Sequence, residues 1–189
     1  MPRPLIDVRV WVVSSADFTA VVEDGPPDAG VRWDIEAKAG GSVIADELAR
    51  GALTAVIECN GRPVGWDSFA TGVITKEDWL RFVLRDREIY GSRSFVEPEY
   101  RGRGLAVRLA RFVHREFARH GYLRDYSVID VLNRNALAVA ARVRHLPIGR
   151  IGYVRCYGFT VIRIGRRVRA GFWSAKNPLV IDFGVFDGP

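Results

Sequence analysis

The chain has 189 residues, of which 48% are hydrophobic and 26% charged, and its formal net charge is +6. This balance is typical of a globular domain and excludes a disordered or fibrous chain. Asp7 and Arg9 interrupt the apolar N-terminal stretch, and no apolar run approaches the roughly 18 residues of a membrane span. We therefore expect a single domain over residues 1–189, cytoplasmic and without a membrane partner.

The first half of the chain predicts mainly strands. Alternating hydrophobicity favours a strand over residues 6–13, and flanking glycines bound a short predicted helix over 40–51. Residues 52–59 and 63–74 are predicted to form a hairpin, because the Asn-Gly pair between them is typical of a tight turn. Residues 76–84 predict a helical or irregular crossing.

A strand is predicted over residues 88–96, ended by Pro98. From Leu105 onward, apolar residues recur at helical spacing until Gly121, which predicts an amphipathic helix with one buried face.

The remaining pattern alternates between the two element types. Residues 126–132 predict a strand, 135–145 a helix stopped by Pro147, and 150–164 a long strand or a hairpin. The chain thus begins with antiparallel strands and continues in the order strand, helix, strand, helix, strand. This order predicts an α/β domain with a mixed, mostly antiparallel sheet flanked by helices.

The loop between the strand at 88–96 and the following helix has the sequence EYRGRG. A helix N-terminus presents unpaired backbone N–H groups and favours negative charge. Gly102 and Gly104 lack a Cβ and let the backbone approach a phosphate closely, while Arg101 and Arg103 can add charge-assisted hydrogen bonds. The loop therefore predicts a phosphate-binding site. The alternative is that the glycines only form the turn that leads into the helix.

The stretch RGRGLA (101–106) resembles the pyrophosphate signature of the Gcn5-related N-acetyltransferases (GNAT), and the element order is similar over roughly residues 40 to 165. The resemblance implies acetyl-CoA as co-substrate and a cleft where the family's fourth and fifth strands splay. It places the backbone amides of Gly102, Arg103, Gly104, Leu105 and Ala106 on the pyrophosphate, and the main chain of Phe95 and Val96 on the pantetheine arm. The family's pantetheine-binding asparagine matches Asn135 best, with Asn133 as its neighbour.

Acetyl transfer to an amine needs a base that takes the amine proton. Asp130 is the candidate, because the resemblance places it near the position of a catalytic glutamate in some family members, although a surface or capping aspartate is the alternative. Glu97 is a second candidate beside the loop, with Glu99.

The sequence departs from the family at the general acid. The tyrosine expected about seven residues after the asparagine is replaced by Arg142 or Val143, so the candidates for protonating the thiolate are Tyr153, Tyr126 and water. The departure leaves open a catalytically silent CoA-binding module.

Ten Lys and Arg residues and no acidic residue lie between Asp130 and Asp182, which predicts a field that attracts anions. We expect the arginines of 150–164 to line one face of a strand and to form a cleft wall for a small anionic or sugar-like amine acceptor. An enzyme of this fold acting on RNA, DNA or aminoacyl-tRNA is the less favoured alternative, since no nucleic-acid motif is present. A homodimer is possible.

Neither the two cysteines nor the three histidines have the spacing of a metal motif, so no metal site is expected.

Overall fold

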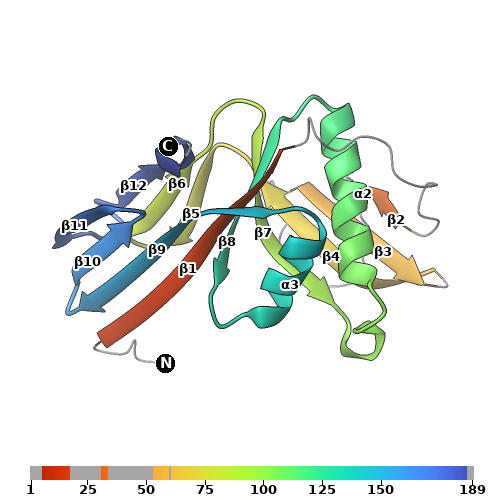
Figure 1. The fold of residues 1–189 in the computed structure, drawn as a ribbon, viewed down its shortest axis with the longest axis horizontal. Helices are drawn as coiled ribbons and strands as arrows, with labels where there is room; N and C mark the ends of the chain where they lie inside the picture. Colours follow the sequence, from red (N-terminus) through yellow and green to blue (C-terminus); the bar gives the residue numbers. More distant parts are fainter. Residues whose placement is uncertain (1–5, 18–30, 34–52, 60, 187–189) are drawn as a thin grey trace.

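The structure is a computed structural model that describes residues 6–17, 31–33, 53–59 and 61–186. Within these residues, nine strands form one sheet in the order β11-β10-β9-β1-β8-β7-β4-β3-β2 (Figure 1). Their bounds are β1 Ile6–Asp17, β2 Val31–Trp33, β3 Leu53–Cys59, β4 Arg62–Ala70, β7 Glu88–Val96, β8 Arg124–Asp130, β9 Leu146–Cys156, β10 Phe159–Ile164 and β11 Arg167–Phe172. The helix predicted over 40–51 lies outside the described residues.

The described part of the chain also contains a second sheet, two α-helices and two short 3-10 helices. The second sheet has the order β12-β6-β5, with β12 at Leu179–Asp182, β6 at Leu80–Val83 and β5 at Val73–Glu77. Helices α2 (Leu105–Arg119) and α3 (Arg134–Arg142) lie on one face of the large sheet (Figure 1). The α/β class with a mixed, mostly antiparallel sheet is thereby confirmed, and neither helix is long and apolar enough to cross a membrane.

The predicted β3–β4 hairpin is present, with Gly61 in its turn at a φ of 73°. The prediction of a helical or irregular crossing over 76–84 was wrong, because β5 ends at Glu77 and β6 begins at Leu80 in an antiparallel pair. Leu80 and Phe82 are buried while Arg81 and Val83 are half-buried, which is the two-residue period of a strand.

Two hydrophobic cores lie on opposite faces of the large sheet. Helix α2 covers one face and buries Leu109, Val113 and Phe117 against β3, β4 and β7. The small sheet and the 3-10 helix η3 (Phe183–Phe186) cover the other face, where the Phe183 ring stacks on Tyr126 at 4.4 Å.

Residues 150–164 were predicted to form a long strand or a hairpin. They belong to a hairpin, in which β9 pairs with β10. The expectation that its arginines line one face was wrong. Arg155 lies on the core side, where its guanidinium sits 5.1 Å from the Trp79 ring and donates to the Trp173 carbonyl. Arg163 lies on the other side, on the same face as Val161 and Phe159. The planar guanidinium can stack on an aromatic ring, which allows Arg155 to lie beside the core.

Strands β7 and β8 are parallel but pair only through Glu88, Ile89 and Tyr90 of β7. Beyond Tyr90, β7 pairs only with β4 and β8 only with β1, so the two strands diverge, with β8 to the lower left of α3 and β7 to its lower right in Figure 1. The predicted splay is therefore present. It leaves the β8-facing edge of β7 without a strand partner in the described part of the chain.

Candidate functional site

A cleft of about 1060 Å³ occupies the opening between β7 and β8 and extends beneath α3 and the start of α2. Most of the residues predicted for cofactor binding line it, together with Asp130: Phe95, Val96, Arg101, Gly102, Gly104, Leu105, Ala106, Asn133 and Asn135. Arg103, Glu97 and Tyr153 do not line it. The geometry thus brings the loop, the β7 edge and the start of α3 to one place.

The loop before α2 has a backbone that exposes its N–H groups. Gly102 and Gly104 have φ values of 76° and 77°, a left-handed conformation that favours glycine, and Gly104 is the N-cap of α2. The Gly104 carbonyl accepts from the N–H groups of Val107 and Arg108. The N–H groups of residues 102–106 make no hydrogen bond to any described residue. Five donors at a helix N-terminus form a site for an anion.

The two loop arginines have different positions. Arg101 donates from Nε to the Val96 carbonyl at 2.9 Å, and its guanidinium lies 5.7 Å from the Phe95 ring, so it ties the loop to the end of β7. Arg103 lies outside the cleft, with its guanidinium 5.2 Å from the Tyr100 ring.

The two asparagines at the start of α3 also differ. Asn133 is the N-cap, and its Oδ1 accepts from the N–H of Ala136 at 3.1 Å. Asn135 lies in the first turn, exposed, and its side chain makes no hydrogen bond to the described residues. Asn133 therefore has a structural partner, whereas the Asn135 amide faces the cleft with its polar atoms available.

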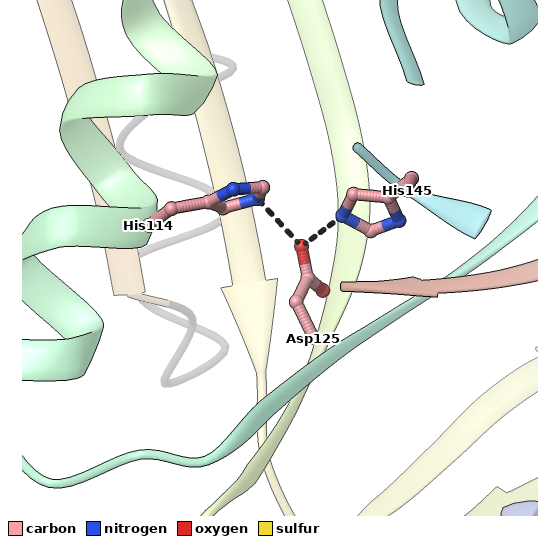
Figure 2. Close-up of side chains that lie close together, drawn as sticks. All are labelled: His114, Asp125 and His145. Atoms are coloured by element: carbon pink, nitrogen blue, oxygen red, sulfur yellow. Dashed lines mark hydrogen bonds and ion pairs between the residues drawn. The ribbon is translucent and has the colours of Figure 1, made fainter. Parts of the chain in front are cut away.

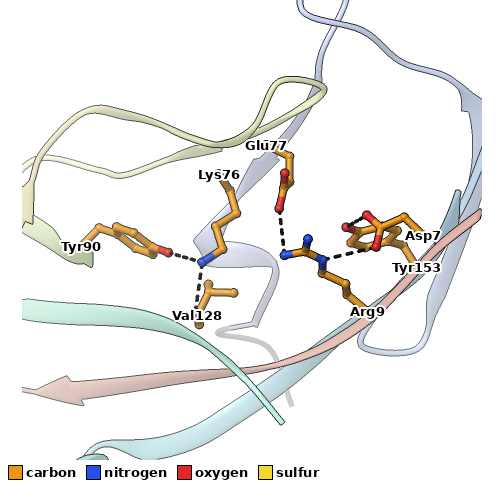
Figure 3. A network of polar contacts seen from close by, with 7 residues as sticks. All are labelled: Asp7, Arg9, Lys76, Glu77, Tyr90, Val128 and Tyr153. Carbon is orange, nitrogen blue, oxygen red and sulfur yellow. Dashed lines mark hydrogen bonds and ion pairs between the residues drawn. The ribbon is translucent and has the colours of Figure 1, made fainter. Parts of the chain in front are cut away.

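Asp130 ends β8 at the cleft, and its Oδ1 accepts from the N–H of Leu132 at 2.9 Å. Nearby, Lys76 Nζ donates to the Tyr90 hydroxyl and to the Val128 carbonyl, each at 3.3 Å (Figure 3). Burial lowers the pKa of Lys76, and the charge of Arg9 lowers it further, against the opposing effects of Glu77 and Asp130. This end of the cleft therefore combines carboxylates with an amine that loses its proton more easily than an exposed lysine.

Neither Tyr153 nor Glu97 lines the cleft, although Tyr153 is linked to Glu77 through Asp7 and Arg9. The Tyr153 hydroxyl donates to Asp7 at 2.6 Å, and its ring packs between Trp11 and Trp79 (Figure 3 shows the hydrogen bond). Burial and this hydrogen bond raise the pKa of Tyr153. The backbone N–H of Glu97 donates to the carbonyl of Val64 on β4, which holds the main chain of Glu97 against that strand.

Sequence reasoning missed a polar cluster at the base of the cleft. Asp125 Oδ2 lies 3.0 Å from His145 Nε2 and 3.5 Å from His114 Nε2, and the three side chains are 4–5% exposed (Figure 2). Burial alone would raise the pKa of Asp125, but the two histidines lower it. The available signal was His114 itself, a polar residue next to Val113 on the buried stripe of α2.

A second carboxyl lies nearby. Asp67 on β4 is 9% exposed, lines the cleft and makes no hydrogen bond to the described residues. Burial, and then the negative charge of Asp125, raise the pKa of Asp67 well above its usual range. Two carboxyls thus share the base of the cleft with opposite pKa shifts.

Comparison with known proteins places this arrangement in context. The family model described as "Acetyltransferase (GNAT) family" matches residues 11–145. Among solved structures, a GNAT-family protein from Novosphingobium aromaticivorans is 20% identical over 82% of this chain and 67% of its own, with a TM-score of 0.51. A Gcn5-related N-acetyltransferase from Sphaerobacter thermophilus is 17% identical over 86% and 52%, with a TM-score of 0.53.

A Drosophila protein is 16% identical over 80% of this chain and 52% of its own, with a TM-score of 0.53. The chain thus spans about half the length of the Drosophila and Sphaerobacter proteins, and at these identities the likeness concerns the fold. No curated protein sequence matches the chain.

Proposed function

Because the chain belongs to the GNAT acetyltransferase family, we propose that it transfers an acetyl group from acetyl-CoA to the primary amine of a small acceptor. The observation that carries the proposal is the juxtaposition of two sets of unpaired backbone groups in one cleft. The N–H groups of residues 102–106 are unpaired at the start of α2, and the β8-facing edge of β7 borders the same cleft.

Each set matches one part of the donor. Backbone N–H groups at a helix N-terminus bind a pyrophosphate, and an unpaired strand edge can pair with the amide groups of an extended arm such as pantetheine. Arg101 positions the loop by its bond to Val96, and Asn135 offers its amide beside the same path. The main chain of Phe95 and Val96 would then hold the inner part of the arm.

Asp130 is the proposed base for the acceptor amine, directly or through water. It lies at the cleft, and an amine that has lost its proton can attack the thioester carbon and expel the CoA thiolate. No tyrosine stands at the family's general-acid position, and neither Tyr153, which donates to Asp7, nor the buried Tyr126, which donates to Glu88, lines the cleft. Water is therefore the proposed proton source for the thiolate.

A small acceptor is favoured over a nucleic acid by where the positive charge lies. Of the ten basic residues between Asp130 and Asp182, only Arg142 lines the cleft. Arg9 and Lys76 line the cleft from the other parts of the chain and could attract a small anionic or sugar-like amine.

The test combines binding and turnover. We expect acetyl-CoA to bind with a 1:1 stoichiometry in calorimetry, and a panel of small amines to yield acetylated product. Asp130→Asn should lower turnover by about 10² to 10⁴ with little change in acetyl-CoA affinity. Lack of acetyl-CoA binding would refute the proposal, and binding without turnover of any amine would indicate a CoA-binding module instead.

The nucleic-acid alternative has its own test. Binding of transfer RNA or duplex DNA should weaken steeply with salt, by a log-log slope of about −0.7 to −0.9 per neutralised phosphate. Saturable submicromolar binding that persists at about 150 mM salt would favour a nucleic-acid substrate over a small amine.

A further inference from the structure

We propose that His114, Asp125 and His145 form a binding site for a divalent transition-metal ion, best matched by Zn²⁺, at the base of the cleft. The three residues come from α2, from β8 and from the turn after α3. The proposal rests on their geometry and is independent of acetyl transfer.

The ligand atoms converge on one point. Both histidines direct Nε2 at Asp125 Oδ2, with separations of 3.0 and 3.5 Å, and the three ligand atoms all lie within 4.8 Å of one another (Figure 2). An ion equidistant from the corners of such a triangle would lie about 2.4 Å or less from each, against about 2.0–2.2 Å for zinc bonds to His nitrogen or carboxylate oxygen. A tetrahedral ion with bonds of this length separates its ligand atoms by about 3.3–3.6 Å, so the two histidine nitrogens, which lie within 4.8 Å of each other, would approach one another by up to roughly 1 Å on binding.

The surrounding groups orient these atoms as an outer shell does in metal sites. The Gly91 N–H donates to Asp125 Oδ1 at 3.2 Å, which leaves Oδ2 for the ion. Ser14 Oγ lies 3.5 Å from His145 Nδ1 and can accept a hydrogen bond from Nδ1–H in the tautomer that leaves Nε2 unprotonated for coordination. On metal binding, the protons that link the histidines to Oδ2 move to Nδ1 or to solvent.

The fourth position of a tetrahedral ion is open to a water from the cleft, which would complete a site with two nitrogen and two oxygen ligands. Asp67 lines the same cleft, is about nine-tenths buried and has no hydrogen-bond partner among the described residues. It is not one of the residues whose ligand atoms converge, but its charge would favour a cation nearby. Imidazole nitrogens favour zinc and its neighbours over Mg²⁺ and Ca²⁺, which prefer oxygen alone.

The ion would have an effect on the chemistry of the cleft. An ion at this point faces the space between β7 and β8, because all three ligands line it. It could bind and polarise an oxygen or nitrogen atom of a molecule in the cleft.

The experiment uses the full chain, stripped with a chelator and titrated with Zn²⁺ in calorimetry and with Co²⁺ in visible absorption. We expect one Zn²⁺ per chain and a cobalt spectrum of tetrahedral intensity. His145→Gln and His114→Gln should each weaken Zn²⁺ binding by at least about 100-fold, and Ser14→Ala by about 10- to 100-fold, as for other outer-shell groups.

His120→Gln is the matched control, because His120 is exposed at the end of the same helix that carries His114. It should bind Zn²⁺ like the parent. The proposal is overturned if the parent chain takes up no stoichiometric Zn²⁺, or if the control loses as much affinity as His145→Gln. If the His→Gln variants fail to fold, Ser14→Ala decides: unchanged affinity in that variant also overturns the proposal. A cluster that binds no metal is a hydrogen-bonded His-Asp-His network only.

Discussion

Replacing Gly104 by alanine separates the cost to the fold from the cost to the ligand. The φ of Gly104 is 77°, and a Cβ built there meets no atom within 4 Å. The fold therefore loses only the backbone strain of a left-handed alanine, about 1–2 kcal/mol. For a domain of this length such a loss lowers the melting temperature by roughly 2–8 °C. The added methyl group lies in the cleft, where the proposed pyrophosphate would sit.

Gly121 provides the matched control at the other end of α2. Its φ is 80°, and a Cβ there also meets no atom within 4 Å, but Gly121 does not line the cleft. Gly121→Ala should therefore lower the melting temperature to a similar extent and leave acetyl-CoA affinity unchanged. Gly104→Ala should weaken acetyl-CoA binding by at least about tenfold, or roughly 1.4 kcal/mol, and Gly104→Val should abolish it.

The measurements are thermal unfolding without ligand and calorimetric titration of acetyl-CoA. Equal affinity of the two alanine variants would refute the assignment of the 102–106 loop to the pyrophosphate. A loss of affinity in both variants to the same extent would mean that the strain, and not the position of the methyl group, is responsible.

Three further predictions follow from named contacts. Asn133→Ala removes the cap of α3 and should lower the free energy of unfolding by about 0.5–2 kcal/mol, whereas Asn135→Ala should leave stability unchanged and weaken acetyl-CoA binding in calorimetry. Lys76→Met removes two hydrogen bonds together with an ammonium that burial disfavours in the folded state. In urea unfolding, its free energy of unfolding relative to the parent should therefore be highest near pH 7 and fall as the pH rises towards about 10.4, where the lysine of the unfolded chain also becomes neutral. Tyr153→Phe removes the hydrogen bond to Asp7 and should reduce stability with unchanged turnover, and a large fall in turnover would restore Tyr153 as an acid candidate.

Local chemistry in the sequence determined much of the end of the cleft formed by β7 and the loop before α2. The strand over 88–96 was predicted with its observed bounds, and α2 begins at Leu105 as predicted, because Pro98, Gly102, Gly104 and the helical apolar spacing act over a few residues. The Asn-Gly hairpin was predictable for the same reason. At such positions the backbone conformation depends mainly on residues close in the chain.

Tertiary structure alone decided which distant residues meet. Strand β1 lies between β8 and β9, far from its neighbours in sequence, and this pairing brings Ser14 to His145. Asp125 meets two histidines 11 and 20 residues away in sequence, a spacing that matches no metal motif. The partner of a strand and the register of its pairing depend on contacts between remote segments. For that reason the loop that would hold acetyl-CoA could be predicted from the sequence, whereas the His-Asp-His cluster beneath it could be seen only in the folded chain.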